Sequence, residues 1–235
     1  MTEAQKRARA SMLRRKKQLR RRMLILIAVI AGIVLIAFMI RRIGSRQTSA
    51  NENWNITDKK YIEERPELDV ELLPINKYSR PGTALTEVNG VVVHYTANPG
   101  TSAMQNRDYF AGLAESHETS ASSHFIIGLK GEIVQCVPCN EVAYASKERN
   151  YDTVSIECCI EDETGKFNDE TYQSLVELVT WLMGRYDLRV EDVIRHYDVT
   201  GKNCPKYYVE NEDAWVNFRN DLAAYIAKNG VDKKK

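Results

Sequence analysis

Hydrophobic and polar residues follow two different periods in the C-terminal two thirds of this chain. Short apolar runs rich in β-branched residues predict strands, and apolar residues that recur every three or four positions predict helices. The expected strands span 90–95, 124–129, 132–137, 153–160 and 193–196, and the expected helices span 104–116, 169–185 and 213–227. The Lys130-Gly131 pair between the second and third strands predicts a hairpin. Strands that alternate with helices indicate an α/β domain with a mixed central β-sheet flanked by helices.

The region from 169 to 185 carries the clearest helical pattern. Leu175, Leu178 and Leu182 recur at three- and four-residue spacing, which places them on one face of a helix. Asn168 stands directly before this run, where a side chain that caps the helix is expected.

One apolar run differs from all the others in its length. Residues 23–40 read MLILIAVIAGIVLIAFMI and contain no charged side chain. As a helix this segment is about 27 Å long, close to the roughly 30 Å thickness of a bilayer core. We therefore expect the α/β domain to be preceded by a single transmembrane helix at 23–40.

Charge is divided sharply along the chain, although the whole sequence carries a formal net charge of only +1. Residues 1–46 hold 13 Lys and Arg against one acid, whereas the remaining residues hold 20 Lys and Arg against 31 Asp and Glu. Most of the basic residues precede the apolar run. The positive-inside rule therefore predicts a cytoplasmic head at 1–22 and an extracytoplasmic C-terminal domain. We predict no nucleic-acid partner, because the basic head adjoins an apolar span and lacks interleaved aromatic residues.

A cleaved signal peptide is the main alternative to a membrane anchor, because signal peptides also begin with basic residues. However, the apolar run is longer than a typical signal-peptide core. Arg41 and Arg42 also stand where small residues are needed for cleavage. An uncleaved single-pass anchor in the cell membrane is therefore favoured.

The chain between this anchor and the patterned region is polar and irregular. Residues 41–79 contain two prolines and show no sustained period, which predicts an extracytoplasmic spacer. The folded domain is then expected over residues 80–230, with a short basic tail over 231–235.

Two histidines and one cysteine form the most informative chemical pattern. His94 ends an apolar run, and His196 and Cys204 flank a short polar turn later in the chain. Imidazole nitrogen and thiolate sulfur are preferred ligands of Zn²⁺, and three protein ligands leave a fourth position for water, as in catalytic zinc sites. We therefore expect a zinc hydrolase whose two histidines lie at strand ends, where the ligands of α/β sheets commonly gather.

Five segments carry a resemblance to a known family. In chain order they read VVVHYTA, SSHFIIGLKGEIVQ, NEVAYAS, VSIE and RHYDVTGKNCP. Together they resemble the zinc-dependent N-acetylmuramoyl-L-alanine amidases, a family that also includes T7-type lysozyme and the peptidoglycan recognition proteins. The resemblance covers nearly the whole predicted domain. It implies a peptidoglycan substrate, which suits a membrane-anchored domain that faces the cell wall.

The resemblance also implies roles for individual residues. His94, His196 and Cys204 match the family's zinc ligands, and the third resembles the subgroup that uses cysteine. Glu157 matches a glutamate used as catalytic base, and Lys202 matches a lysine assigned to transition-state stabilisation. A carboxylate beside a zinc-activated water can move its proton to the leaving amine, and a fixed cation can stabilise the developing oxyanion. The expected reaction is hydrolysis of the amide bond between N-acetylmuramic acid and L-alanine.

This chain departs from the family's pattern at two positions. Ser123 stands where T7-type members have a catalytic tyrosine, which gives Glu157 a larger share in activating water. Ala145 stands where many relatives carry a histidine, so the substrate contacts of that histidine do not carry over. Some relatives have lost the zinc cysteine and only recognise muropeptides. A non-catalytic recognition module is therefore the alternative function, and the presence of Cys204 favours the enzyme.

The other cysteines leave three alternatives open. Cys136, Cys139, Cys158 and Cys159 are compatible with buried free thiols, with a disulfide between strands, or with a second metal site. Cys158 and Cys159 cannot easily share a metal, because adjacent strand residues point to opposite faces. His124 lies in an apolar run and is expected to be a hydrogen-bonded structural residue.

Overall fold

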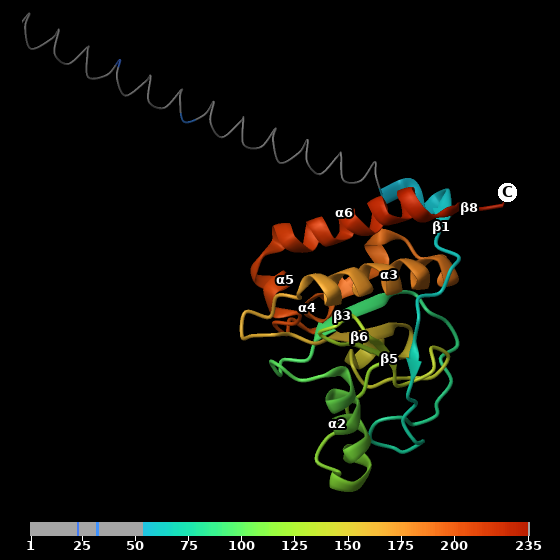
Figure 1. Cartoon of the computed structure of the whole chain (residues 1–235), viewed down its shortest axis with the longest axis vertical. Coiled ribbons are helices and arrows are strands. Elements are labelled where there is room, and N and C mark those ends of the chain that lie inside the picture. Colours follow the sequence, from blue (N-terminus) through green and yellow to red (C-terminus); the bar gives the residue numbers. More distant parts are fainter. Residues whose placement is uncertain (1–22, 24–31, 33–53, 235) are drawn as a thin grey trace, which may run out of the picture. The chain divides into compact units, whose positions relative to one another are not determined.

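The computed structural model describes residues 54–234 together with Met23 and Gly32, and its domain is built around a six-stranded sheet (Figure 1). The strands lie in the order β2-β5-β4-β6-β3-β7. Their bounds are Asp69–Val70 (β2), Val91–Tyr95 (β3), Phe125–Ile127 (β4), Ile133–Gln135 (β5), Val154–Cys158 (β6) and Val193–Arg195 (β7). β4 and β5 form an antiparallel hairpin, and the other neighbouring strands pair in parallel. The predicted mixed sheet and its hairpin are confirmed.

Helices cover both faces of the sheet (Figure 1). α2 (Ala103–Ser116) packs against β4 and β5 on one face, and α3 (Asp169–Tyr186) packs against β3 and β4 on the other. α6 (Glu212–Asn229) lies on α3, so the three helices predicted within the α/β domain are all present. The predicted cap of α3 is also confirmed, because the side-chain oxygen of Asn168 accepts the backbone N–H of Thr171 at 2.9 Å. The shorter helices are η1 (Asn55–Asp58), η2 (Lys147–Tyr151), η3 (Val190–Asp192), α4 (His196–Thr200) and α5 (Lys206–Glu210).

The register of the parallel strands places the two most important polar side chains on one face. His94 of β3 lies beside Glu157 of β6, and Ile126 of β4 lies on the other side of Glu157. Neighbouring residues in register point to the same face of a sheet. Ile126 belongs to the hydrophobic core that includes Phe110 and Leu113 of α2. His94 and Glu157 therefore point to the side of the sheet that α2 covers.

The N-terminal described segment differs from the predicted spacer. Residues 54–79 contribute β1 (Lys60–Tyr61), which pairs antiparallel with β8 (Val231–Asp232), and β2, which pairs with β5. Leu73 is fully buried in the core beneath α2. The domain therefore begins before residue 80, and the predicted tail at 231–235 starts as a strand. The sequence did not predict this because strands of two residues are too short to show a period. The buried contacts of this segment are made by single apolar residues that are far apart in the sequence.

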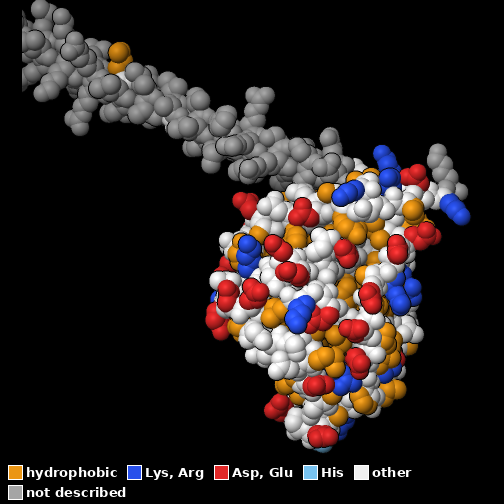
Figure 2. Space-filling model, in the orientation of Figure 1, with side chains coloured by type: hydrophobic (Ala, Val, Ile, Leu, Met, Phe, Trp, Pro, Cys, Tyr) orange, Lys and Arg blue, Asp and Glu red, His pale blue; other side chains and the backbone are white. Residues whose placement is uncertain are grey.

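Acidic side chains are spread over the face of the domain shown in Figure 2, with basic side chains in smaller groups between them. This distribution agrees with the excess of Asp and Glu over Lys and Arg after residue 46.

The predicted membrane segment lies almost entirely outside the described residues. Of the head at 1–22 and the transmembrane helix at 23–40, the structure describes only Met23 and Gly32. Within the described part of the chain, no helix has the length and apolar character needed to cross a membrane.

Replacing Leu73 with alanine tests whether the N-terminal segment belongs to the domain. Leu73 is 0% exposed, whereas its neighbour Leu72 is 37% exposed and serves as the matched control. We expect Leu73→Ala to lower the free energy of unfolding by about 2–5 kcal/mol, because it leaves a cavity in the core. Leu72→Ala should change that free energy by only about 0.5 kcal/mol. Denaturant unfolding of both variants measures the difference, and equally small effects would contradict the packing of this segment.

Candidate metal centre and active site

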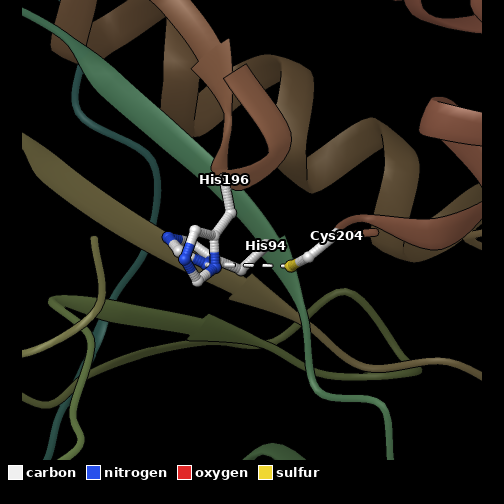
Figure 3. A group of neighbouring side chains, drawn as sticks. All are labelled: His94, His196 and Cys204. Atoms are coloured by element: carbon white, nitrogen blue, oxygen red, sulfur yellow. Dashed lines mark hydrogen bonds between the residues drawn. The ribbon is translucent and has the colours of Figure 1, made fainter. Parts of the chain in front are cut away.

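Three side chains from separate elements converge at the C-terminal ends of the central strands (Figure 3). His94 belongs to β3, His196 is the first residue of α4, and Cys204 lies in the loop that follows α4. The strand predicted to include His196 ends one residue earlier, at Arg195. The chain turns into a helix here because a carboxylate oxygen of Asp198 accepts the backbone N–H of Arg195 at 2.8 Å, and Asp198 also pairs with the Arg195 guanidinium.

The ligand atoms of the three residues are close enough to bind one metal ion. All three atoms lie within 4.8 Å of one another. The Nδ1 atoms of His94 and His196 are 3.1 Å apart, and the Sγ atom of Cys204 is 3.8 Å from Nδ1 of His94. All three residues are buried. The structure therefore brings together the three residues that the sequence identifies as ligands.

The electrostatic surroundings suit metal binding. Burial lowers the pKa of His94 well below its ordinary value, and a proton on the neighbouring His196 and the positive charge of Lys202 would act in the same direction. Burial, helped by Lys202 and Lys147, lowers the pKa of His196 to about 4. Burial raises the pKa of the Cys204 thiol to about 12, and the charge of Glu157 adds to this. Both imidazoles are therefore neutral near pH 7, and the thiol would lose its proton on binding a metal ion.

Glu157 stands beside this cluster with unused hydrogen-bonding capacity. One carboxylate oxygen, Oε1, lies 4.0 Å from Nδ1 of His94, and the side chain is 19% exposed. The other oxygen, Oε2, is buried and has no hydrogen-bond partner among the described residues. Burial raises the pKa of Glu157 to about 8, and the positive charge of Lys202 opposes this. Burying a carboxylate oxygen without a hydrogen-bond partner costs free energy. We therefore expect a polar group to lie beside Oε2 of Glu157.

A pocket of about 660 Å³ opens beside the metal cluster. Its lining includes His196 and Lys202 on the α4 side and Lys147 and Asn150 on the η2 side. Two lysines and no carboxylate contribute to this lining. The pocket therefore presents positive charge next to the candidate metal ligands. Lys202, which the sequence predicts to be a site residue, lies in the wall of this pocket.

The loop from 144 to 150 adds residues that the sequence alone does not identify. Ser146 is buried, and its hydroxyl lies 3.2 Å from Nε2 of His94. Lys147 lines the pocket. Its backbone φ is 49°, in the left-handed region that non-glycine residues seldom adopt. The only signal in the sequence is that Ser146 ends the NEVAYAS segment and that Lys147 directly follows it.

The two positions that depart from the family's pattern occupy different surroundings. Ser123 is fully buried, and its hydroxyl donates to the backbone carbonyl of Phe125 at 2.7 Å. Ala145 lines the pocket. His124 has the structural role predicted for it, because its ring nitrogens contact the Ser155 hydroxyl at 3.0 Å and the Glu141 carbonyl at 2.9 Å.

All five cysteines are free thiols. For Cys136, Cys139, Cys158 and Cys159 the structure therefore favours free thiols over a disulfide between strands. Cys136, Cys158 and Cys159 are buried, and Cys139 is half-buried. Among the residues that the structure describes, only His94, His196 and Cys204 form a group that could hold a metal. Burial raises the pKa of Cys136 and of Cys159 to about 12, as expected for unreactive core thiols.

Comparison with known proteins places this domain in a family. Residues 84–207 match the Amidase_2 family, described as N-acetylmuramoyl-L-alanine amidase. The chain is similar to N-acetylmuramoyl-L-alanine amidase CwlL of Bacillus licheniformis, with 37% identity over 172 residues that cover 68% of this chain and 47% of that protein. It is 32% identical over 182 residues to N-acetylmuramoyl-L-alanine amidase BlyA of Bacillus subtilis (strain 168), covering 68% of this chain and 48% of that protein. The chain thus spans about half the length of these curated relatives.

A solved structure supports the same assignment. The catalytic domain of XlyA aligns with a TM-score of 0.56 and 26% identity, over 67% of this chain and 99% of that one. The family match covers more than half of this chain and includes the three candidate ligands, Glu157 and Lys202. The resemblance seen in the sequence is confirmed, and the chain belongs to the N-acetylmuramoyl-L-alanine amidase family.

Proposed function

We propose that this chain is a zinc-dependent N-acetylmuramoyl-L-alanine amidase that hydrolyses the amide bond between N-acetylmuramic acid and L-alanine in peptidoglycan. The observation that carries the proposal is the convergence of His94, His196 and Cys204 beside a pocket, with Glu157 next to them. Family membership and the names of the relatives support the same substrate.

The donor set fits zinc. Two neutral imidazoles and one thiol form a set that is common at catalytic zinc sites, with one coordination position left for water or substrate. The unpartnered Oε2 atom of Glu157 is a second observation in favour, because a buried carboxylate oxygen beside the candidate ligands needs a polar partner. When bound, zinc supplies a Lewis acid that makes a water molecule a stronger nucleophile near neutral pH.

Glu157 and Lys202 supply the remaining chemistry. The positive charge of a bound zinc ion would favour the ionised form of Glu157. In that form Glu157 takes a proton from the attacking water and returns it to the nitrogen of L-alanine as the carbon–nitrogen bond breaks. The charge of Lys202 acts on this site, as its influence on the pKa values of His94, His196 and Glu157 indicates. From the pocket wall it stabilises the negative charge that develops on the scissile carbonyl oxygen.

Digestion of purified peptidoglycan by the full-length protein tests this proposal. We expect new amino termini of L-alanine to appear without new reducing ends of the glycan chain. A chelator should abolish the release, and added zinc should restore it. Binding to peptidoglycan without release of amino termini would contradict the enzyme and support the recognition module instead.

We also propose that residues 23–40 anchor the protein in the cell membrane with the catalytic domain facing the wall. The support is the uncharged 18-residue run and the basic cluster that precedes it. Protease added to intact protoplasts should digest the domain and spare the basic head. A domain that stays protected until the membrane is lysed would contradict this orientation.

A further inference from the structure

The ring of His94 has a hydrogen-bonding partner on the side opposite the metal cluster. Its Nδ1 atom faces His196 and Cys204, whereas its Nε2 atom lies 3.2 Å from the hydroxyl oxygen of Ser146. His94 and Ser146 are each only 1% exposed, so water does not replace this contact. The two nitrogens of one imidazole therefore have separate partners.

We propose that Ser146 is a positioning residue for the metal centre: its hydroxyl accepts the Nε2–H of His94 and so allows His94 to bind the metal through Nδ1. A neutral imidazole carries one proton, and a ring that coordinates through Nδ1 must carry that proton on Nε2. In a buried site this N–H needs an acceptor, because an unsatisfied donor is costly. Ser146 is the acceptor that the structure provides.

Ser146 is held in place independently of the metal ligands. The side-chain oxygen of Asn150 accepts the backbone N–H groups of Ala145 and Ser146, at 3.0 and 2.5 Å. These bonds close the loop that leads into η2 and hold the backbone of Ser146 beside His94 through contacts that involve no candidate metal ligand. This arrangement orients the ring from outside the ligand set, which is how partners of ligating histidines raise metal affinity.

The inference rests on the metal site of the proposed function, but its main test measures zinc affinity and not amidase activity. Competition with a chromophoric chelator gives the zinc dissociation constant of the full-length protein and of its variants. Loss of an outer hydrogen-bond partner of a ligating histidine typically weakens metal binding about 10- to 100-fold. We expect a weakening of that size for Ser146→Ala.

Ser155 offers a matched control. It is also a buried serine whose hydroxyl contacts a buried histidine, His124, at 3.0 Å, but that histidine belongs to no metal cluster in the described part of the chain. Ser155→Ala should therefore leave the zinc dissociation constant within about threefold of the parent value. Equal zinc affinity in parent and Ser146→Ala proteins would overturn the proposal, and so would an equal loss in both variants.

A spectroscopic measurement on the parent protein keeps the proposal testable if the Ser146 variant does not fold. Nitrogen-15 NMR of the zinc-loaded protein reports which ring nitrogen of His94 carries the proton. We expect the proton on Nε2, with slow exchange with solvent because Ser146 accepts it. A proton on Nδ1 would mean that His94 binds zinc through Nε2 and would overturn the role of Ser146. Tight zinc binding with the expected NMR signal but no peptidoglycan cleavage would contradict the proposed function alone.

Discussion

Replacing Cys204 with alanine should leave a folded protein that binds far less than one zinc ion per chain and has lost amidase activity. Cys204 is the only sulfur ligand of the cluster and the only ligand that becomes negatively charged when it binds a metal. Without it, two imidazoles remain, and the net charge of the occupied site rises by one. Metal analysis after gel filtration, together with release of L-alanine amino termini from peptidoglycan, measures both losses.

Cys136→Ala provides the matched control for this prediction. Cys136 is as deeply buried as Cys204, but it lies in the hydrophobic core beneath α2 and away from the metal cluster. This variant should lose some stability, because large-to-small substitutions in a core leave a cavity, and it should keep its zinc and its activity. Full zinc retention by Cys204→Ala would remove Cys204 from the metal site.

The main parts of the site could be predicted because His94 and Glu157 lie near the ends of strands with a clear pattern and His196 directly follows another such strand. Parallel strands bring their carboxyl ends to one edge of the sheet, so His94 and Glu157 fall beside each other in register. His196 follows the third of these strands, and the short turn after it returns Cys204 to the same edge. The strand pattern and the donor types identified His94, His196 and Cys204, and the resemblance of the VSIE segment to the family identified Glu157.

The role of Ser146 and the packing of the N-terminal segment could not be predicted. Both depend on single contacts between segments that are distant in the sequence, and a local pattern of residues does not reveal such contacts. Ser146 is separated by 52 positions from the histidine that it contacts, and the loop that carries it has no helical or strand period. The N-terminal segment joins the domain through two short strands and through isolated buried residues such as Leu73. Only tertiary packing distinguishes these residues from those of a spacer or an ordinary loop.

Glu157→Gln should keep the metal and lose most of the turnover. Glutamine has nearly the same shape as glutamate, so the cluster of His94, His196 and Cys204 should remain intact. An amide cannot accept the proton of the attacking water, and general-base catalysis typically contributes about 10²–10⁴-fold to rate. We therefore expect kcat to fall by a factor in this range while the zinc content stays at one ion per chain. Near-normal turnover would remove Glu157 from the mechanism.

The same variant should change how the stability of the metal-free protein depends on pH. Burial raises the pKa of Glu157 to about 8 in the folded state, from an ordinary value of 4.5. Between these two values the folded state holds a proton that the unfolded state has released, so the free energy of unfolding falls as the pH rises from 4.5 to 8. Glu157→Gln removes this contribution, and denaturant unfolding of the chelator-treated proteins should show a smaller decrease over that interval. An unchanged pH dependence would mean that Glu157 is not held in a buried, unpartnered state beside the metal ligands.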